Sequence, residues 1–140
     1  MRSRAGSGSR AARHAPVDVV FDGRCGFCTL AVARLQRLDR RGSITAYPFQ
    51  RPGVLERFGL TSEEAQSAAW AFDATARFRG AGAAARALDA ALGVRLCVPL
   101  YRVPPLRLLA DRAYRWVADN RSRLRGSAPW CVQHPADCAR

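Results

Sequence analysis

The sequence predicts an α/β domain in which a mixed four-stranded sheet is flanked by helices and followed by an added C-terminal helix. Two patterns predict it: a strand–helix–strand unit over residues 17–49, and a pair of short strands over residues 68–79. The 140 residues, 49% of them hydrophobic, suit one compact domain with a real core. We expect parallel strands in the first unit and an antiparallel hairpin in the second.

The first unit begins with the β-branched run Val17–Phe21, which is typical of a buried strand. The residues DGRCG then supply a turn. Apolar positions recur at helical spacing over Cys28–Leu38, and Gly42 follows the end of this helix. Ser43–Phe49 is expected as the second strand, which Pro48 stops.

The second half of the sheet follows a possible short helical segment in RPGVLERFG. Thr61 and Glu64 form a capping box, which predicts a brief helical turn. The strands Ala68–Asp73 and Thr75–Arg79 come next, and the alanine-rich Ala81–Leu92 has strong helix propensity.

The added helix is expected from Pro104 to Arg123, after an apolar connector that three prolines interrupt. We expect Tyr114 and Trp116 to be core residues of this helix. Its expected apolar stripe consists of Leu106, Leu109, Ala113, Trp116, Val117 and Leu124.

Three regions follow from these elements: a disordered basic tail over residues 1–15, a domain over 16–126 and an irregular C-terminal tail over 127–140. We expect the C-terminal tail to be free of the domain. No apolar run approaches the ~20 residues of a membrane span, and no apolar segment follows the basic N-terminus as in a secretory signal. We therefore expect a cytoplasmic protein with no membrane span.

The net charge of +12 comes from a chain in which all 23 basic residues are arginine. Complete avoidance of lysine together with abundant alanine indicates coding bias. The basic surface should bind polyanions weakly at low salt. No nucleic-acid motif is present, so we expect no specific nucleic-acid partner.

The most informative motif is CGFC, at the junction of the first strand and helix. Cys25 would lie at the helix N-terminus, where unpaired N–H groups and the helix dipole favour a thiolate over a thiol. Cys28 would lie about one turn further on and more buried. This placement predicts a redox dithiol with Cys25 as the nucleophile and Cys28 as the resolving thiol.

Four neighbours complete the candidate site. Arg24 would add positive charge if its side chain turns inward, and Phe27 could form part of an apolar contact surface for a partner. Asp22 is either a carboxylate that handles a proton for Cys28 or a turn residue that binds backbone N–H groups; we favour the turn. Gly23 fits a tight turn that needs a positive φ or a close backbone approach.

Residues 17–126 resemble the DCC family of predicted thiol-disulfide oxidoreductases. The family's Asp-x-x-Cys-x-x-Cys pattern matches Asp22, Cys25 and Cys28. VPPLRLLADRAYRWVADNRSRLRG resembles its C-terminal helix, with Tyr114, Asn120 and Arg121 in the expected surroundings.

The resemblance implies a thioredoxin-like fold and a redox role on a protein or small-molecule thiol or disulfide, without a cofactor. Thioredoxins carry a cis-proline before the third strand, and TSEEAQSAAW has none. This departure puts thioredoxin-style substrate docking in doubt. Asn120, Arg121 and Arg123 could bind an anionic substrate or the helix's own C-terminal carbonyls, and we favour the carbonyls.

Two alternatives remain open. Cys25, Cys28, Cys131 and His134 could form a zinc site, with Cys138 nearby. The chain could also be a non-enzymatic interaction module with a basic surface. Cys131 and Cys138 are expected as two thiols of the C-terminal tail or as a second redox pair, and Cys97 as a small buried hydrophobe.

Overall fold

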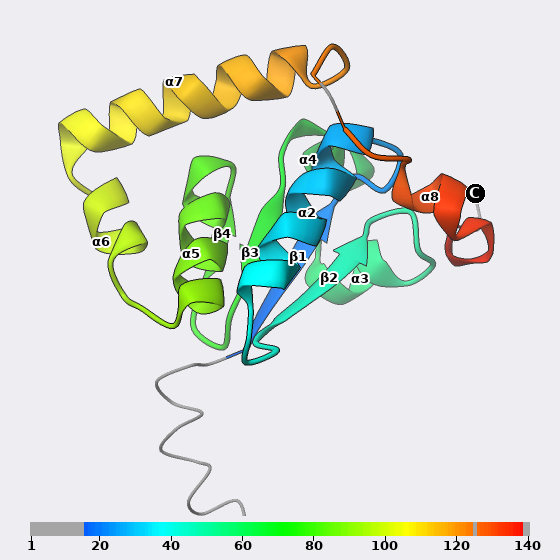
Figure 1. Ribbon diagram of the computed structural model, residues 1–140, viewed down its shortest axis with the longest axis horizontal. Coiled ribbons are helices and arrows are strands. Elements are labelled where there is room, and N and C mark those ends of the chain that lie inside the picture. Colours follow the sequence, from blue (N-terminus) through cyan, green and yellow to red (C-terminus); the bar gives the residue numbers. More distant parts are fainter. Residues whose placement is uncertain (1–15, 125, 139–140) are drawn as a thin grey trace, which may run out of the picture.

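The computed structural model describes residues 16–124 and 126–138 and contains a four-stranded sheet in the order β2-β1-β3-β4 (Figure 1). Its strands are β1 (Val17–Phe21), β2 (Ile44–Pro48), β3 (Trp70–Phe72) and β4 (Arg77–Arg79). β1 pairs parallel with β2 and antiparallel with β3, and β3 pairs antiparallel with β4. The predicted mixed sheet is confirmed.

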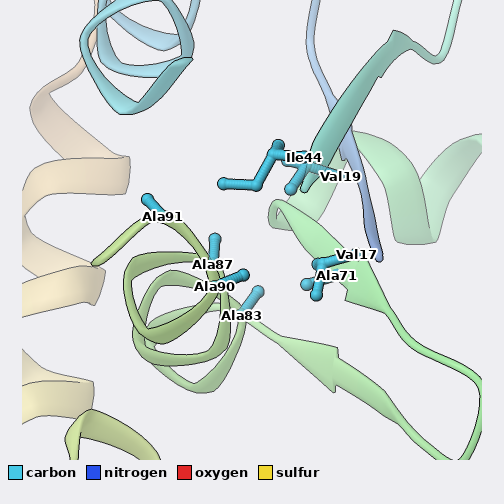
Figure 2. Close-up of a cluster of buried hydrophobic side chains, with 8 residues drawn as sticks. All are labelled: Val17, Val19, Ile44, Ala71, Ala83, Ala87, Ala90 and Ala91. Carbon is cyan, nitrogen blue, oxygen red and sulfur yellow. The ribbon is translucent and has the colours of Figure 1, made fainter. Parts of the chain in front are cut away.

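Helices cover both faces of this sheet. Alternate residues of β1 point to opposite faces, as the two-residue period of a strand requires. Val17 and Val19 pack with α5 (Ala81–Leu92) (Figure 2). Leu35 of α2 (Gly26–Leu38) packs against the same cluster. Val20 packs on the other side with α3 (Val54–Phe58) and α4 (Ser62–Ser67). The arrangement is consistent with a thioredoxin-like fold.

Local signals account for several element boundaries. The predicted capping box is present: Thr61 Oγ1 accepts from the N–H of Glu64, and the Glu64 carboxylate accepts from the N–H of Thr61. Asp89, a buried residue of α5, positions the helix that follows. Its carboxylate accepts hydrogen bonds of 2.7–3.1 Å from three successive N–H groups at the start of α6 (Cys97–Tyr101). Burial opposes the charge on Asp89, but these bonds lower its pKa overall. Part of the proline-rich connector is therefore helical.

The helix α7 (Pro104–Asn120) lies across the α2 and α5 side of the domain (Figure 1). Its inward residues include Tyr114, whose hydroxyl accepts a 2.9 Å hydrogen bond from the N–H of Ala69. This contact sets the helix rotation, and the expected apolar stripe lies largely on the outer side. Leu109 is 66% exposed and Trp116 is 59% exposed, so the prediction that Trp116 is a core residue is wrong.

The C-terminal residues 126–138, which we call the C-terminal segment, include the short helix α8 (Trp130–Gln133) and a 3-10 turn η1 (Pro135–Asp137). The Trp130 ring contacts Phe21 edge-on, with 6.1 Å between ring centroids. The expectation of a free, irregular tail is therefore wrong for these residues. The boundaries of the three predicted regions stay predictions, and residues 1–15 lie outside the described residues.

Within the described residues, none of the helices combines the length and the apolar composition that a bilayer crossing requires.

Candidate active site

Cys25 is the N-cap residue of α2, at the end of the turn that follows β1. Its backbone is extended (φ −96°, ψ 117°), and its Sγ accepts a 3.1 Å hydrogen bond from the N–H of Cys28. The position predicted for Cys25 is therefore confirmed. Unpaired N–H groups at a helix start carry partial positive charge, so the first turn of α2 can stabilise a negative sulfur here.

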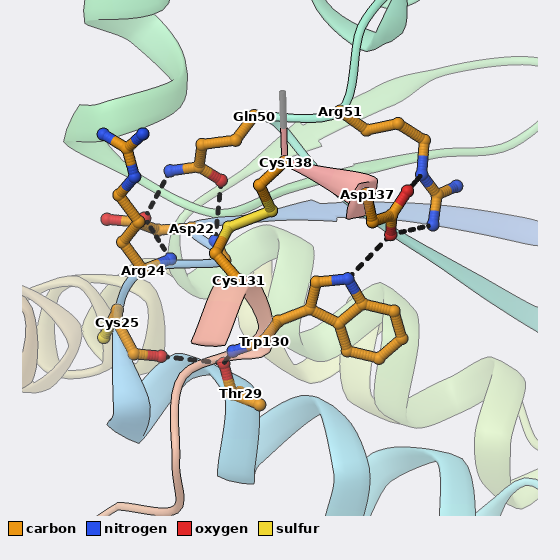
Figure 3. The surroundings of a disulfide bond; sticks show 11 residues. Asp22, Arg24, Cys25, Thr29, Gln50, Arg51, Trp130, Cys131, Asp137 and Cys138 are labelled. Atoms are coloured by element: carbon orange, nitrogen blue, oxygen red, sulfur yellow. Dashed lines mark hydrogen bonds and ion pairs between the residues drawn. A yellow bond between two sulfur atoms is a disulfide. The ribbon is translucent and has the colours of Figure 1, made fainter. Parts of the chain in front are cut away.

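Asp22 joins the turn to Gln50, as Figure 3 shows, and also to Arg121. Its Oδ1 accepts hydrogen bonds from the N–H of Arg24 at 3.0 Å and from Gln50 Nε2 at 2.8 Å. Gln50 Oε1 in turn accepts from the N–H of Gly23 at 2.9 Å. Asp22 Oδ2 pairs with Arg121 Nη2 at 3.3 Å. The turn role expected of Asp22 is confirmed, and the carboxylate also holds a cation.

Cys28 lies in the first turn of α2, partly buried, with the guanidinium of Arg121 beside it. Arg121 Nη1 is 3.5 Å from Cys28 Sγ, and Nη2 is 3.3 Å from both Asp22 Oδ2 and the carbonyl oxygen of Gln66. Burial raises the pKa of the Cys28 thiol to about 12, its interaction with Cys25 adds to the rise, and Arg121 opposes it. The Cys28 thiol is therefore a weak acid that is in contact with the cationic side chain of Arg121.

Arg121 remains charged in this setting. Burial lowers its pKa, but the neighbouring Cys28 and Asp22 raise the pKa overall. Our preference for contacts with the carbonyls of the helix is therefore wrong for Arg121, whose side chain reaches α4, Asp22 and the dithiol. It is confirmed for Asn120, whose Nδ2 donates to the carbonyl of Trp116 at 2.7 Å. The signal in the sequence that singled out Arg121 was its position in the stretch that resembles the family's C-terminal helix.

The C-terminal segment passes directly over the dithiol turn. The N–H of Cys131 donates to the carbonyl of Gly23 at 2.9 Å, and the N–H of Ser127 donates to the carbonyl of Gly26 at 3.2 Å. A Cβ on Gly26 would lie 2.5 Å from the Ser127 oxygen. Both glycines of the DGRCG turn thus allow a close approach, which is one of the two reasons expected for Gly23.

Side chains fix the segment further (Figure 3). Thr29 Oγ1 accepts from the N–H of Trp130 at 3.0 Å and donates to the carbonyl of Cys25 at 2.9 Å. Asp137 accepts two hydrogen bonds from Arg51, at 2.6 and 2.8 Å, and one from Trp130 Nε1 at 2.8 Å. Sequence reasoning missed the contacts of Trp130 and Asp137, because they join residues far apart in the chain or lie in a segment without periodicity.

The zinc site is not assembled. Cys131 forms a disulfide with Cys138, and His134 stacks on Trp130 with 4.1 Å between ring centroids. In the part of the chain that the structure describes, no group of three His, Cys, Asp or Glu residues could hold a metal ion. Cys25, Cys28 and Cys97 are free thiols.

The remaining predicted site residues lie near the dithiol but make different contacts. Arg24 is exposed and lines a polar hollow that Asp22, Gln50 and Arg121 also line. Phe27 is partly buried and lines an apolar cavity on the other side of Cys28. The described residues contain no cis peptide bond.

Comparison with known proteins agrees with this site. A family model described as DCC1-like thiol-disulfide oxidoreductase matches residues 19–127, which include the dithiol turn and Arg121. The chain belongs to this family. Neither a curated protein nor a solved structure matches it.

Proposed function

We propose that this member of the DCC1-like thiol-disulfide oxidoreductase family exchanges thiols and disulfides through Cys25 and Cys28. The observation that carries the proposal is the pairing of a sulfur at a helix N-cap with a second sulfur beside a cation. Cys25 Sγ accepts the N–H of Cys28, and Cys28 Sγ contacts Arg121. Each arrangement stabilises a thiolate at the step that needs one.

In the first step, the Cys25 thiolate attacks one sulfur of a substrate disulfide. A bond forms between Cys25 Sγ and that sulfur, the substrate S–S bond breaks, and the other substrate sulfur leaves as a thiolate that takes a proton from water. The exposed side of the turn admits the substrate. Arg24 and Phe27 are the proposed contacts with it.

In the second step, Cys28 loses its proton and attacks Cys25 Sγ. The Cys25–Cys28 disulfide forms, and the bound substrate sulfur leaves as a thiolate. Cys28 is a poor nucleophile beforehand, because burial and its contact with Cys25 both raise its pKa. Bonding of Cys25 to the substrate removes the contribution of Cys25, whereas Arg121 still favours the Cys28 thiolate. The first step therefore activates the second.

Asp22 has two proposed roles in the second step. Its carboxylate holds Arg121 at 3.3 Å, and so keeps the cation against Cys28. It is also the proposed acceptor of the proton that Cys28 releases. An external thiol reductant then restores the dithiol, and the reaction uses no cofactor because the two electrons come from the cysteines. The substrate is a protein or small-molecule thiol or disulfide, and a cytoplasmic location stays a prediction.

Mass spectrometry of the protein after exposure to bis(2-hydroxyethyl) disulfide tests this proposal. We expect a peptide pair joined through Cys25 and Cys28, lighter by two hydrogens, which an added dithiol reverses. Cys97 should stay free in the same sample, and serves as the internal control. A bond that joins Cys25 to any other cysteine, or no change at Cys25, would contradict the proposal.

A further inference from the structure

A cavity of about 300 Å³ lies between α2, α5 and the inward face of α7, beside the dithiol. Small and apolar side chains form most of its wall, among them Phe27, Ala31, Leu35, Ala84, Ala87 and Val117. Its polar groups include the thiol of Cys28 and the guanidinium of Arg121. A mainly apolar hollow with a few polar groups at one place is the usual form of a small-molecule site.

Two features of the chain keep this space open. α5 lines the cavity mainly with the small side chains of Ala83, Ala84 and Ala87, and with one larger side chain, that of Leu88. α7 is held by Tyr114, which contacts Ala69, and about two turns later by Arg121. These polar contacts hold α7 against the start of β3, α4 and the dithiol turn, and so position the α7 side of the cavity.

We infer that this cavity binds the apolar group of a thiol or disulfide substrate and thereby brings the substrate's sulfur to the dithiol. The inference rests on the proposed function and names the class of substrate. The position of Cys28 supports it, because this wall residue of the cavity donates its N–H to Sγ of the proposed nucleophile, Cys25, at 3.1 Å. A purely polar thiol would leave the apolar wall in contact with water.

The volume of the cavity limits which apolar groups it can accommodate. An apolar cavity of about 150 Å³ accepts benzene, so a space of about 300 Å³ accommodates one aromatic ring with a short aliphatic chain. Ala31 and Ala84 are exposed as well as lining the cavity, so they mark its opening to solvent. A second copy of this chain is a poor occupant, because two chains of net charge +12 repel each other.

Two matched disulfides test the inference by kinetics. Benzyl 2-hydroxyethyl disulfide carries an aromatic ring, and bis(2-hydroxyethyl) disulfide has the same S–S bond without one. We expect the wild-type protein to reduce the benzyl compound with a kcat/KM roughly tenfold to a hundredfold higher, mainly through KM. Ala31→Leu and Ala84→Leu should each bring this ratio towards one, because the added side chain occupies the opening.

Ala33→Leu is the matched control, since Ala33 is an exposed residue of the same helix that does not line the cavity. This variant should keep the wild-type ratio. Equal reduction of the two disulfides by the wild-type protein would overturn the inference and leave the proposed function intact.

Binding of benzyl 2-hydroxyethyl thioether, which cannot be reduced, separates the inference from the proposed function. Isothermal titration should detect it with the wild-type protein and with Ala33→Leu, and show weaker binding with Ala31→Leu. This result would support the cavity as a binding site even if neither disulfide were reduced. Absence of reduction together with binding would reject the proposed function but not the inference. Undetectable binding to the wild-type protein would overturn the inference.

Discussion

The molecule contains two cysteine pairs that differ in their surroundings more than in their spacing. Cys25 and Cys28 are free thiols at a helix N-terminus, with a backbone N–H and a guanidinium against the sulfurs. Cys131 and Cys138 form a disulfide within the C-terminal segment. The first pair has groups that stabilise a thiolate, whereas the second closes a short loop that contains Asp137, the hydrogen-bond partner of Trp130. These surroundings suit the first pair to the exchange chemistry that we propose, and the second pair to a structural role.

The largest effect should come from the nucleophile. Cys25→Ser should lower turnover of bis(2-hydroxyethyl) disulfide by roughly 10³-fold or more, because a hydroxyl does not replace a thiolate in exchange. Cys131→Ser/Cys138→Ser should retain turnover within a few-fold of the wild-type rate. A loss of turnover in the double variant that matches Cys25→Ser would make the second pair a relay.

The second pair should matter for the stability of the fold rather than for turnover. Removing the Cys131–Cys138 disulfide, which joins residues seven apart, should lower the free energy of unfolding by roughly 2–3 kcal/mol, through the entropy of the unfolded chain. Urea denaturation of Cys131→Ser/Cys138→Ser under non-reducing conditions measures this loss. Cys97→Ser is the control for replacement of a partly buried cysteine, with an expected change below about 1 kcal/mol. An unchanged midpoint in the double variant would mean that the disulfide adds nothing to the fold.

Replacing Arg121 should slow the second step selectively. Arg121→Gln removes the charge beside Cys28 and should slow closure of the Cys25–Cys28 disulfide by roughly tenfold, equivalent to about one pKa unit at the thiol. Quenched-flow detection of the mixed disulfide on Cys25 should show that it accumulates. Arg115→Gln is the matched control, because Arg115 is an exposed residue of α7, the helix that Arg121 caps. Equal closure rates in both variants would remove Arg121 from the mechanism.

The smallest effect concerns the anchor of the C-terminal segment. The hydrogen bond from Arg51 lowers the pKa of Asp137 below its ordinary value of 3.8. A lowered pKa in the folded state gives stability that is present above about pH 4 and is lost as the pH falls through the folded value. Asp137→Asn should therefore cost about 1 kcal/mol at neutral pH, and the difference from wild type should shrink below pH 4. Thermal denaturation across pH 2–7 measures this loss of stability, and Asp119→Asn, at an exposed carboxylate, is the control. A loss that stays constant with pH would contradict a stabilising ion pair between Arg51 and Asp137.

Two of the three tryptophans, Trp116 and Trp130, show how far the sequence could predict the fold and the site. Helical periodicity placed Trp116 in the core and left Trp130 in a free tail, and the structure reverses both. Periodicity identifies an apolar stripe but does not say which side of a helix a distant partner covers. Trp130 lies in a segment with little periodicity, and its position depends on contacts with Thr29 and Asp137.

The dithiol turn was predictable because its determinants are local. A β-branched strand, a DGRCG turn and a helix start occupy consecutive residues, and together they position Cys25 and Asp22. The cation beside Cys28 is 93 residues away in sequence, on a helix whose rotation depends on Tyr114. Only the resemblance to the family's C-terminal motif pointed to Arg121, and physical reasoning from the helix alone assigned it a different contact.

Trapping of the intermediate tests the central claim most directly. Cys28→Ser, mixed with benzyl 2-hydroxyethyl disulfide and quenched with acid, should hold a stable mixed disulfide on Cys25 that mass spectrometry of peptides locates, because no resolving thiol is left. Cys25→Ser treated in the same way should hold none on Cys28. A mixed disulfide on Cys28 in the second variant, and none on Cys25 in the first, would contradict the assignment of nucleophile and resolving thiol.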